Sequence, residues 1–135
     1  MHSYSVLKKA ETKTACIEFC NDDIVRVLFK KEVEIDAQEL KNIFDIYNDF
    51  TKGKSCGYIY HAEDGVANLS GEAKRFMNLN PNYFQKKCVA VVVKSLPQRL
   101  VANFYLKIVQ SRTPYKVFNS LSDAEKWCLT FFEKA

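Results

Sequence analysis

Acidic residues are missing from a long stretch of this chain. Between Ala73 and Ser122 there is no Asp or Glu, although nine Lys and Arg residues occur there. They are Lys74, Arg75, Lys86, Lys87, Lys94, Arg99, Lys107, Arg112 and Lys116. Residues 1–67 hold nine basic and twelve acidic side chains for a net charge of −3, while residues 68–135 hold eleven and four for +7. This asymmetry, hidden within a formal net charge of +4, predicts a surface that faces an anionic partner.

The chain also lacks long apolar runs and flexible linkers. Its longest uninterrupted apolar stretch, 88–93, is far shorter than the roughly 20 residues of a transmembrane helix. Lys8 and Lys9 are not followed by an apolar segment, so we expect no signal peptide and predict a cytoplasmic location. With only four Gly and three Pro, no low-complexity linker divides the chain. We predict a polar N-terminal lead, 1–13, and a single domain, 14–135.

Motifs for metals and for covalent catalysis are absent as well. There is no Cys-x-x-Cys and no His-x-x-x-His. Cys16 and Cys20 share a strand face but lie about 13 Å apart, too far for one ion. Cys56 and His61 are predicted to point to opposite faces of one strand, which argues against a Cys–His nucleophile. We therefore expect no metal, no cofactor and no enzymatic activity, and we expect the five cysteines to be reduced and structural.

His61 is the best acid–base candidate that remains. It ends a predicted strand and precedes Glu63 and Asp64, whose carboxylates would raise its pKa. The alternative is that it simply ends the strand. No Gly-x-Gly-x-x-Gly or Walker sequence is present, so a dedicated nucleotide site is not predicted.

Apolar periodicity predicts an alternation of strands and helices. Segments 15–21 and 24–31 alternate as strands around a turn at 21–23. Asp36 and Glu39 form a capping box for an amphipathic helix, 36–51, that Gly53 closes. The later elements are a strand 55–61, a helix from Ser70, a strand 88–93, a helix with a Ser95 and Gln98 capping box, a strand 115–118, and a helix capped by Ser122 and Glu125.

This order sets the predicted fold class. Segment 88–93 is apolar at every position, so both of its faces must be covered, as in a central parallel strand. The element order β-β-α-β-α-β-α-β-α then predicts a single α/β domain with right-handed crossovers. We expect a mixed, mainly parallel sheet of about five strands covered by about four helices.

Three segments resemble the C-terminal half of small bacterial STAS-like domains, the SpoIIAA-like proteins. They are 100–107, 113–118 and 124–127. The resemblance implies a mixed sheet covered by helices. It also implies a non-enzymatic regulatory or protein-interaction module or, as in the related CRAL-TRIO-type carriers, a lipid binder.

The start of the second predicted helix is a candidate site. Free backbone N–H groups at Ser70 and Gly71 favour an anion. In the sigma-factor-regulating STAS proteins, a phosphorylated serine lies at this point within an Asp-Ser-Ser-Gly pattern, and the resemblance transfers that role to Ser70 alone. Here Leu69 replaces one Ser and Asn68 replaces the Asp. The alternative is that Ser70 only caps its helix.

A second candidate is a docking or anion-binding face on two helices. Lys74 and Arg75 lie on the second predicted helix, and Arg99, Asn103 and Lys107 follow one polar stripe of the third. A solvated helix face would look the same. The predicted partner is another protein with an acidic surface, and self-association is an alternative.

Other partners are less well supported. Tyr58 and Tyr60 share a strand face, where they either pack beneath a helix or line a pocket for an apolar ligand or lipid with a basic rim. Nucleic acid is an improbable partner, because the pI of about 8.7 is modest and the basic residues are spread along the chain without a recognised motif.

Overall fold

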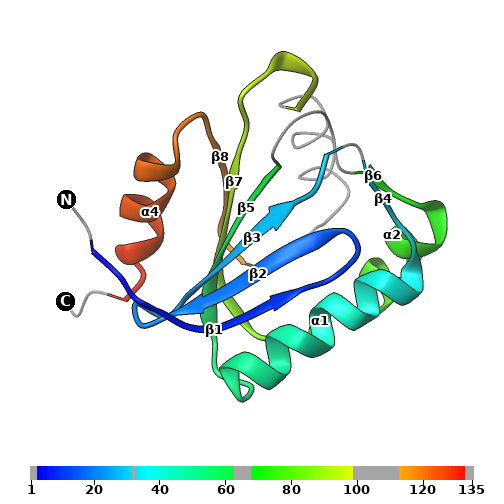
Figure 1. The fold of residues 1–135 in the computed structure, drawn as a ribbon, viewed down its shortest axis with the longest axis horizontal. Coiled ribbons are helices and arrows are strands. Elements are labelled where there is room, and N and C mark those ends of the chain that lie inside the picture. Colours follow the sequence, from blue (N-terminus) through cyan, green and yellow to red (C-terminus); the bar gives the residue numbers. More distant parts are fainter. Residues whose placement is uncertain (1–2, 32, 63–67, 99–112, 133–135) are drawn as a thin grey trace.

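Six strands form one sheet in the order β1-β2-β3-β5-β7-β8 (Figure 1). The computed structural model describes residues 3–31, 33–62, 68–98 and 113–132. The strands of the sheet are β1 (Val6–Glu11), β2 (Ala15–Cys20), β3 (Ile24–Phe29), β5 (Cys56–Ala62), β7 (Lys86–Val92) and β8 (Tyr115–Phe118). A separate two-stranded ribbon consists of β4 (Glu34–Ile35) and β6 (Asn68–Leu69).

The sheet is mixed and mainly parallel, as predicted. β1, β2 and β3 are antiparallel neighbours, whereas β3, β5, β7 and β8 run parallel. The turn between β2 and β3 has Asp23 at a φ of 62°, and the amide of Ile24 donates to Asp22 Oδ1 at 3.2 Å. The predicted hairpin is therefore present, with a side chain closing its turn.

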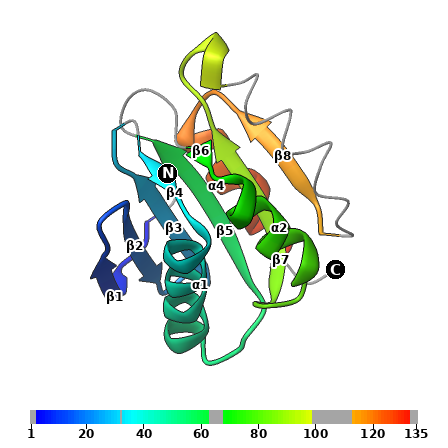
Figure 2. The ribbon, with the colours of Figure 1, turned by 90° about the vertical axis from the view of Figure 1, so that its right-hand side faces the viewer.

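Helices cover both faces of the sheet, so each face has its own core. Helices α1 (Ala37–Thr51) and α2 (Gly71–Leu79) lie over one face, and α4 (Leu121–Leu129) lies over the other (Figure 2). The larger apolar cluster packs beneath α1 and α2, and the smaller one packs beneath α4. Within the described residues, no helix is both long enough and apolar enough to cross a bilayer.

The first helix follows its predicted signals, but the last does not. Asp36 Oδ1 accepts from the Glu39 amide at 2.8 Å, and α1 ends in left-handed backbone at Lys52 and Gly53. The cap of α4 is Ser120, which accepts from the Asp123 amide at 3.0 Å, and not Ser122. Two serines compete at this helix start, and sequence spacing alone favoured the wrong one.

Only the start of the third predicted helix belongs to the described residues. The chain is helical over 96–98, and Ser95 Oγ accepts from the Gln98 amide at 3.3 Å. Gln98 Oε1 in turn accepts from the Lys94 amide at 2.7 Å. The helix thus begins where predicted, and its continuation from residue 99 lies outside the described residues.

The segment 1–13 differs from the predicted polar lead, because it contains β1. Sequence gave little sign of a strand, since Lys8, Lys9 and Glu11 interrupt the alternation. The structure shows how these side chains are satisfied. Lys8 donates to the Phe50 carbonyl, and Lys9 pairs with Glu18 of β2. An edge strand tolerates such residues because it has one neighbour.

Candidate functional site

The β4·β6 ribbon brings two helix N-termini together. β4 leads directly into α1 and β6 leads directly into α2. The two short strands pair in parallel, with Glu34 opposite Asn68 and Ile35 opposite Leu69. The Ser70 amide also donates to the Ile35 carbonyl at 2.9 Å. Because paired strands are about 4.8 Å apart, the caps of α1 and α2 start from neighbouring positions.

Ser70 caps α2. Its Oγ accepts from the Ala73 amide at 3.1 Å, and its backbone is extended, with a φ of −65° and a ψ of 165°. The side chain is half-buried. Ser70 therefore caps its helix, which is one of the two interpretations that the sequence allowed. A role as phosphate acceptor remains a prediction.

Carboxylates surround this helix start, which argues against a free anion there. Asp36 caps the neighbouring helix, and Glu34 lies opposite Asn68 in the ribbon. Glu72 lies in the first turn of α2. These negative charges already occupy the positive ends of the two helices. Gly71 is exposed, and a Cβ at this position would contact nothing within 4 Å, so its lack of a side chain does not form a ligand cradle.

The predicted docking face is only partly within the described residues. On α2, Arg75 is exposed and Lys74 is half-buried. Arg99, Asn103 and Lys107 lie outside the described residues. Whether the two helices form one face is thus a prediction that remains to be tested.

The basic residues of the two halves of the sequence differ in whether they form ion pairs. In every ion pair formed between two described residues, the cation comes from the acidic first half. These cations are Lys9, Arg26, Lys30, Lys41, Lys52 and Lys54.

The cations of the acid-free stretch behave differently. Lys86, Lys87 and Lys116 lie over the rings of Phe84, Phe132 and Phe118, at 4.5, 4.8 and 5.4 Å from the ring centroids. Among the described residues, no carboxylate pairs with Arg75 or Lys94 and no aromatic ring lies beneath either, and both are exposed. Among the described cations of the acid-free stretch, Arg75 and Lys94 are therefore the exposed side chains with neither a carboxylate nor a ring partner that is itself described. Arg99 and Lys107 lie outside the described residues.

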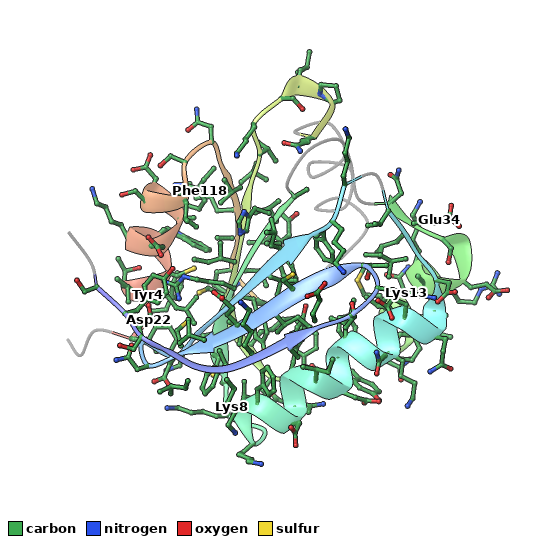
Figure 3. All side chains as sticks on the ribbon, in the orientation of Figure 1. Tyr4, Lys8, Lys13, Asp22, Glu34 and Phe118 are labelled. Carbon is green, nitrogen blue, oxygen red and sulfur yellow. The ribbon has the colours of Figure 1, made fainter. Side chains whose placement is uncertain are left out.

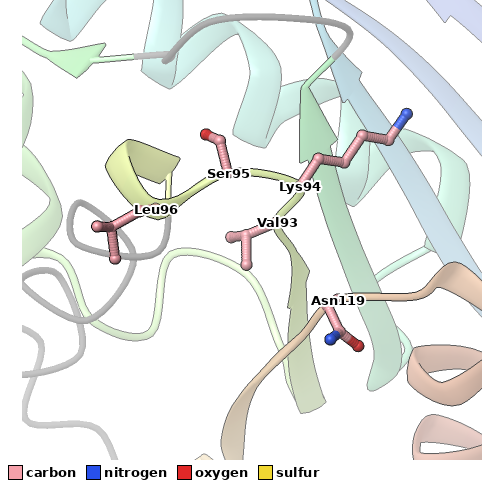
Figure 4. A pocket seen from close by; sticks show the side chains of 5 residues that line it. All are labelled: Val93, Lys94, Ser95, Leu96 and Asn119. Atoms are coloured by element: carbon pink, nitrogen blue, oxygen red, sulfur yellow. The ribbon is translucent and has the colours of Figure 1, made fainter.

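An open hollow lies at the carboxyl end of the parallel strands (Figure 4). It has a volume of about 270 Å³, and it lies between the chain that leaves β7 and the residue that follows β8. Its lining residues are Val93, Lys94, Ser95, Leu96 and Asn119. Carboxyl ends of parallel strands are common ligand positions. This hollow is smaller and more open than the enclosed pockets that hold most small molecules.

His61 does not have the environment that its sequence neighbours suggested. Burial and the nearby Lys94 ammonium lower its pKa, and Glu18 opposes them more weakly. The expectation that Glu63 and Asp64 would raise it is therefore wrong in direction, and those two residues lie outside the described ones. A lowered pKa keeps the imidazole neutral at physiological pH.

The cysteines are free thiols, four of them buried. Cys56 lies in the cluster beneath α1, whereas His61 lies on the opposite face of β5, so the two side chains do not meet. Burial raises the pKa of Cys56 to about 11, which keeps its thiol protonated and unreactive. Among the described residues, no three His, Cys, Asp or Glu side chains are grouped as a metal site requires.

Sequence reasoning missed a buried charge cluster around Arg26. Its guanidinium donates to both Asp22 oxygens, at 3.2 and 3.0 Å, and twice to Glu125 Oε2, at 3.1 and 2.6 Å. Tyr4 covers the cluster with its ring centroid 3.5 Å from the guanidinium carbon, and it lies beside Asp22 in Figure 3. Arg26 is only 5% exposed. The cluster fixes the N-terminal segment, the β2–β3 turn and α4 to each other.

Tyr58 and Tyr60 pack in the core beneath the helices. Tyr58 is fully buried, with its ring 5.0 Å from Tyr47 of α1 and 4.8 Å from Phe84. Tyr60 stacks on Phe29 at 5.9 Å. The preferred interpretation, packing beneath a helix, is confirmed for Tyr58.

Comparisons with known proteins give a family and a fold. Residues 18–132 match the model of a family described as a domain of unknown function, DUF7793. The chain belongs to this family. The family match begins at Glu18, so it leaves β1 outside and includes both helix starts of the β4·β6 ribbon. A comparison with curated proteins gave no match.

A solved structure confirms the fold of this DUF7793 domain. It is the 2.25 Å crystal structure of an uncharacterised DUF3478 protein from Shewanella loihica PV-4 with a SpoIIAA-like fold. The TM-score is 0.56 at 16% identity, and the match covers 95% of this chain and 97% of that one. The predicted SpoIIAA-like resemblance is therefore correct at the level of the fold, and at this identity it carries no residue roles.

Replacing Ser70 tests its capping role in the DUF7793 domain. Ser70→Ala removes the bond to the Ala73 amide, so we expect the free energy of unfolding to fall by about 1 kcal/mol. Ser70→Asp keeps a good cap and should retain most of that stability. Urea denaturation followed by circular dichroism measures both. Equal losses in the two variants would contradict a capping role.

Proposed function

We propose that this protein is a non-enzymatic, STAS-like protein-interaction module. It docks on an acidic surface of another protein through α2 and the helix that begins at residue 96. The observation that carries this proposal is that Arg75 and Lys94 are exposed and have no carboxylate partner among the described residues. In the ion pairs formed between two described residues, by contrast, every cation comes from the first half.

Electrostatics support a protein partner over a small anion. Exposed, unpaired cations on the outside of a domain raise the association rate with a negatively charged partner and select against positively charged ones. A small anion needs several donors converging on one point, whereas the first turn of α2 carries Glu72 and the neighbouring helix start carries Asp36. A broad acidic surface needs only a few separated cations.

Phosphorylation of Ser70 would regulate this docking. A phosphate carries nearly two negative charges at pH 7. At Ser70 it would lie next to Glu34 of the ribbon and the Asp36 cap that follows it, and one turn before Lys74 on α2. It would therefore repel the neighbouring helix start and neutralise the cationic face, and both effects weaken binding to an acidic partner.

Affinity purification from a lysate of the producing cells identifies the class of partner, when both protein and lipid are measured by mass spectrometry. We expect a protein with an acidic surface, eluted by moderate salt because the contact is largely electrostatic. Recovery of a bound lipid without a protein would instead favour the carrier alternative. A Ser70 phosphopeptide in the same digest would support the regulatory step.

A further inference from the structure

Exposed apolar side chains gather at one end of β1. Six large apolar side chains are exposed among the described residues, and three of them lie within residues 4–7. These are Tyr4, Val6 and Leu7, which are 37%, 45% and 58% exposed. The other three, Leu79, Leu96 and Leu121, are far apart in the sequence. Tyr4 packs on Arg26, so Val6 and Leu7 are the exposed apolar residues of β1 itself.

The backbone of β1 is also open to pairing. In the described part of the chain, β1 is hydrogen-bonded to β2 alone and ends the six-stranded sheet. A bulge between Val6 and Lys8 leaves Leu7 without a partner on β2. The outer edge therefore presents unpaired N–H and C=O groups beside exposed apolar side chains, a template for another strand.

Charged residues commonly protect such an edge, but those of β1 are directed onto their own molecule. Lys8 Nζ donates to the Phe50 carbonyl at 3.4 Å, at the end of α1. Lys9 pairs with Glu18 at 3.8 Å, and Glu11 pairs with Lys30 at 2.7 Å. Each of these three side chains therefore has a partner within its own subunit, although Lys9 and Glu11 are 65% exposed.

We propose that β1 pairs antiparallel with β1 of a second copy of this chain, around a two-fold axis at Leu7. In this register Leu7 faces Leu7 of the second copy and Val6 faces Lys8. No like charges are opposed, and both exposed apolar residues of β1, Val6 and Leu7, lie within the paired stretch. An axis at Lys8 or Lys9 would set lysines against each other, which is destabilising.

The resulting dimer is weak and depends on concentration. The paired stretch is short, and the bulge twists the edge away from a flat geometry. The contact is therefore smaller than that of a stable dimer, which buries about 1,200–2,000 Å². Because the dimer is two-fold symmetric, each subunit contributes the same surface, the outer edge of β1.

Analytical ultracentrifugation of the full chain, from low micromolar to submillimolar concentration, tests the pairing. The wild-type protein should show a monomer–dimer equilibrium. Leu7→Lys sets two lysines across the axis and should lower the association constant at least about tenfold. Leu121→Lys adds the same charge on α4 and should leave association unchanged. A wild-type protein that stays monomeric throughout overturns the proposal. The same result is expected if this edge instead pairs with a strand of another protein.

A cysteine cross-link tests the register. Residues directly opposite in an antiparallel pair have Cβ atoms about 4.5–5.5 Å apart, so Leu7→Cys should form an intermolecular disulfide on treatment with diamide. Leu121→Cys and the wild-type protein, whose cysteines are mostly buried, are the controls. Cross-linking of Leu7→Cys no faster than these controls overturns the register.

Discussion

Replacing Arg26 by Met is expected to lower the free energy of unfolding by about 3 kcal/mol, because it leaves two buried carboxylates without their cation. Asp22 and Arg26 are each 5% exposed and Glu125 is 14% exposed. Only the Tyr4 ring separates the cluster from solvent. We therefore expect a loss of free energy at the lower end of the range seen when a buried ion pair is broken. Urea denaturation at neutral pH measures the loss.

The same turn supplies a matched control. Lys54 pairs with Asp23 at 2.9 Å, but its side chain is 58% exposed. Lys54→Met should therefore cost less than about 1 kcal/mol. Adding Glu125→Gln to Arg26→Met removes one uncompensated charge and should restore part of the loss. Similar costs for Arg26→Met and Lys54→Met would show that the buried cluster does not hold α4 in place.

Two substitutions of Tyr58 are expected to change the free energy of unfolding in opposite directions. Tyr58→Ala leaves a cavity in the core beneath α1 and should lower the free energy of unfolding by about 3–5 kcal/mol. Tyr58→Phe should instead raise it by about 1 kcal/mol. The reason is that the Tyr58 hydroxyl is buried and makes no hydrogen bond to any described residue, so removing it removes only a desolvation cost. Thermal and urea unfolding measure both variants.

Tyr83 is the control for this pair. Its hydroxyl donates to the Asp45 carboxylate near the surface, and this bond lowers the pKa of Asp45. Tyr83→Phe should therefore destabilise slightly, by less than about 1 kcal/mol. If Tyr58→Phe were destabilising as well, the Tyr58 hydroxyl would have a binding partner in the core. That result would favour an internal ligand over a packed interior.

Much of the fold could be predicted because its signals are local. The segment 88–93 is apolar throughout and forms most of β7, which has a parallel neighbour on each side. The strand 115–118 coincides with β8, and the Asp36 cap starts α1 as expected. These features depend on residues close together in sequence, where periodicity and capping are informative.

The missed elements depend on contacts between distant segments. β4 and β6 are two residues each and exist because they pair with one another across the first helix. Arg26 has the spacing of a polar strand residue, and its burial results from Glu125, which is far away in sequence. Only the position of Asp22, four residues before Arg26, could have suggested a pair. Periodicity carries no information on such long-range partners.

For the candidate site, sequence located the helix start but not its surroundings. The Ser70 cap was among the predicted alternatives and is present. The carboxylates of the neighbouring helix start were not foreseen, because the ribbon that brings them close was not. The acid-free stretch identified a set of cations, and the structure separates those lying over aromatic rings from Arg75 and Lys94.

If Lys74 and Arg75 on α2 bind an acidic protein, charge reversal on this helix should abolish partner capture. Arg75→Glu should reduce the captured amount at least about tenfold, because it opposes like charges at the contact. Lys126→Glu, an exposed cation on α4 over the opposite face, should capture as the wild type does. Both variants should unfold at the wild-type temperature. Undiminished capture by Arg75→Glu would contradict the claim.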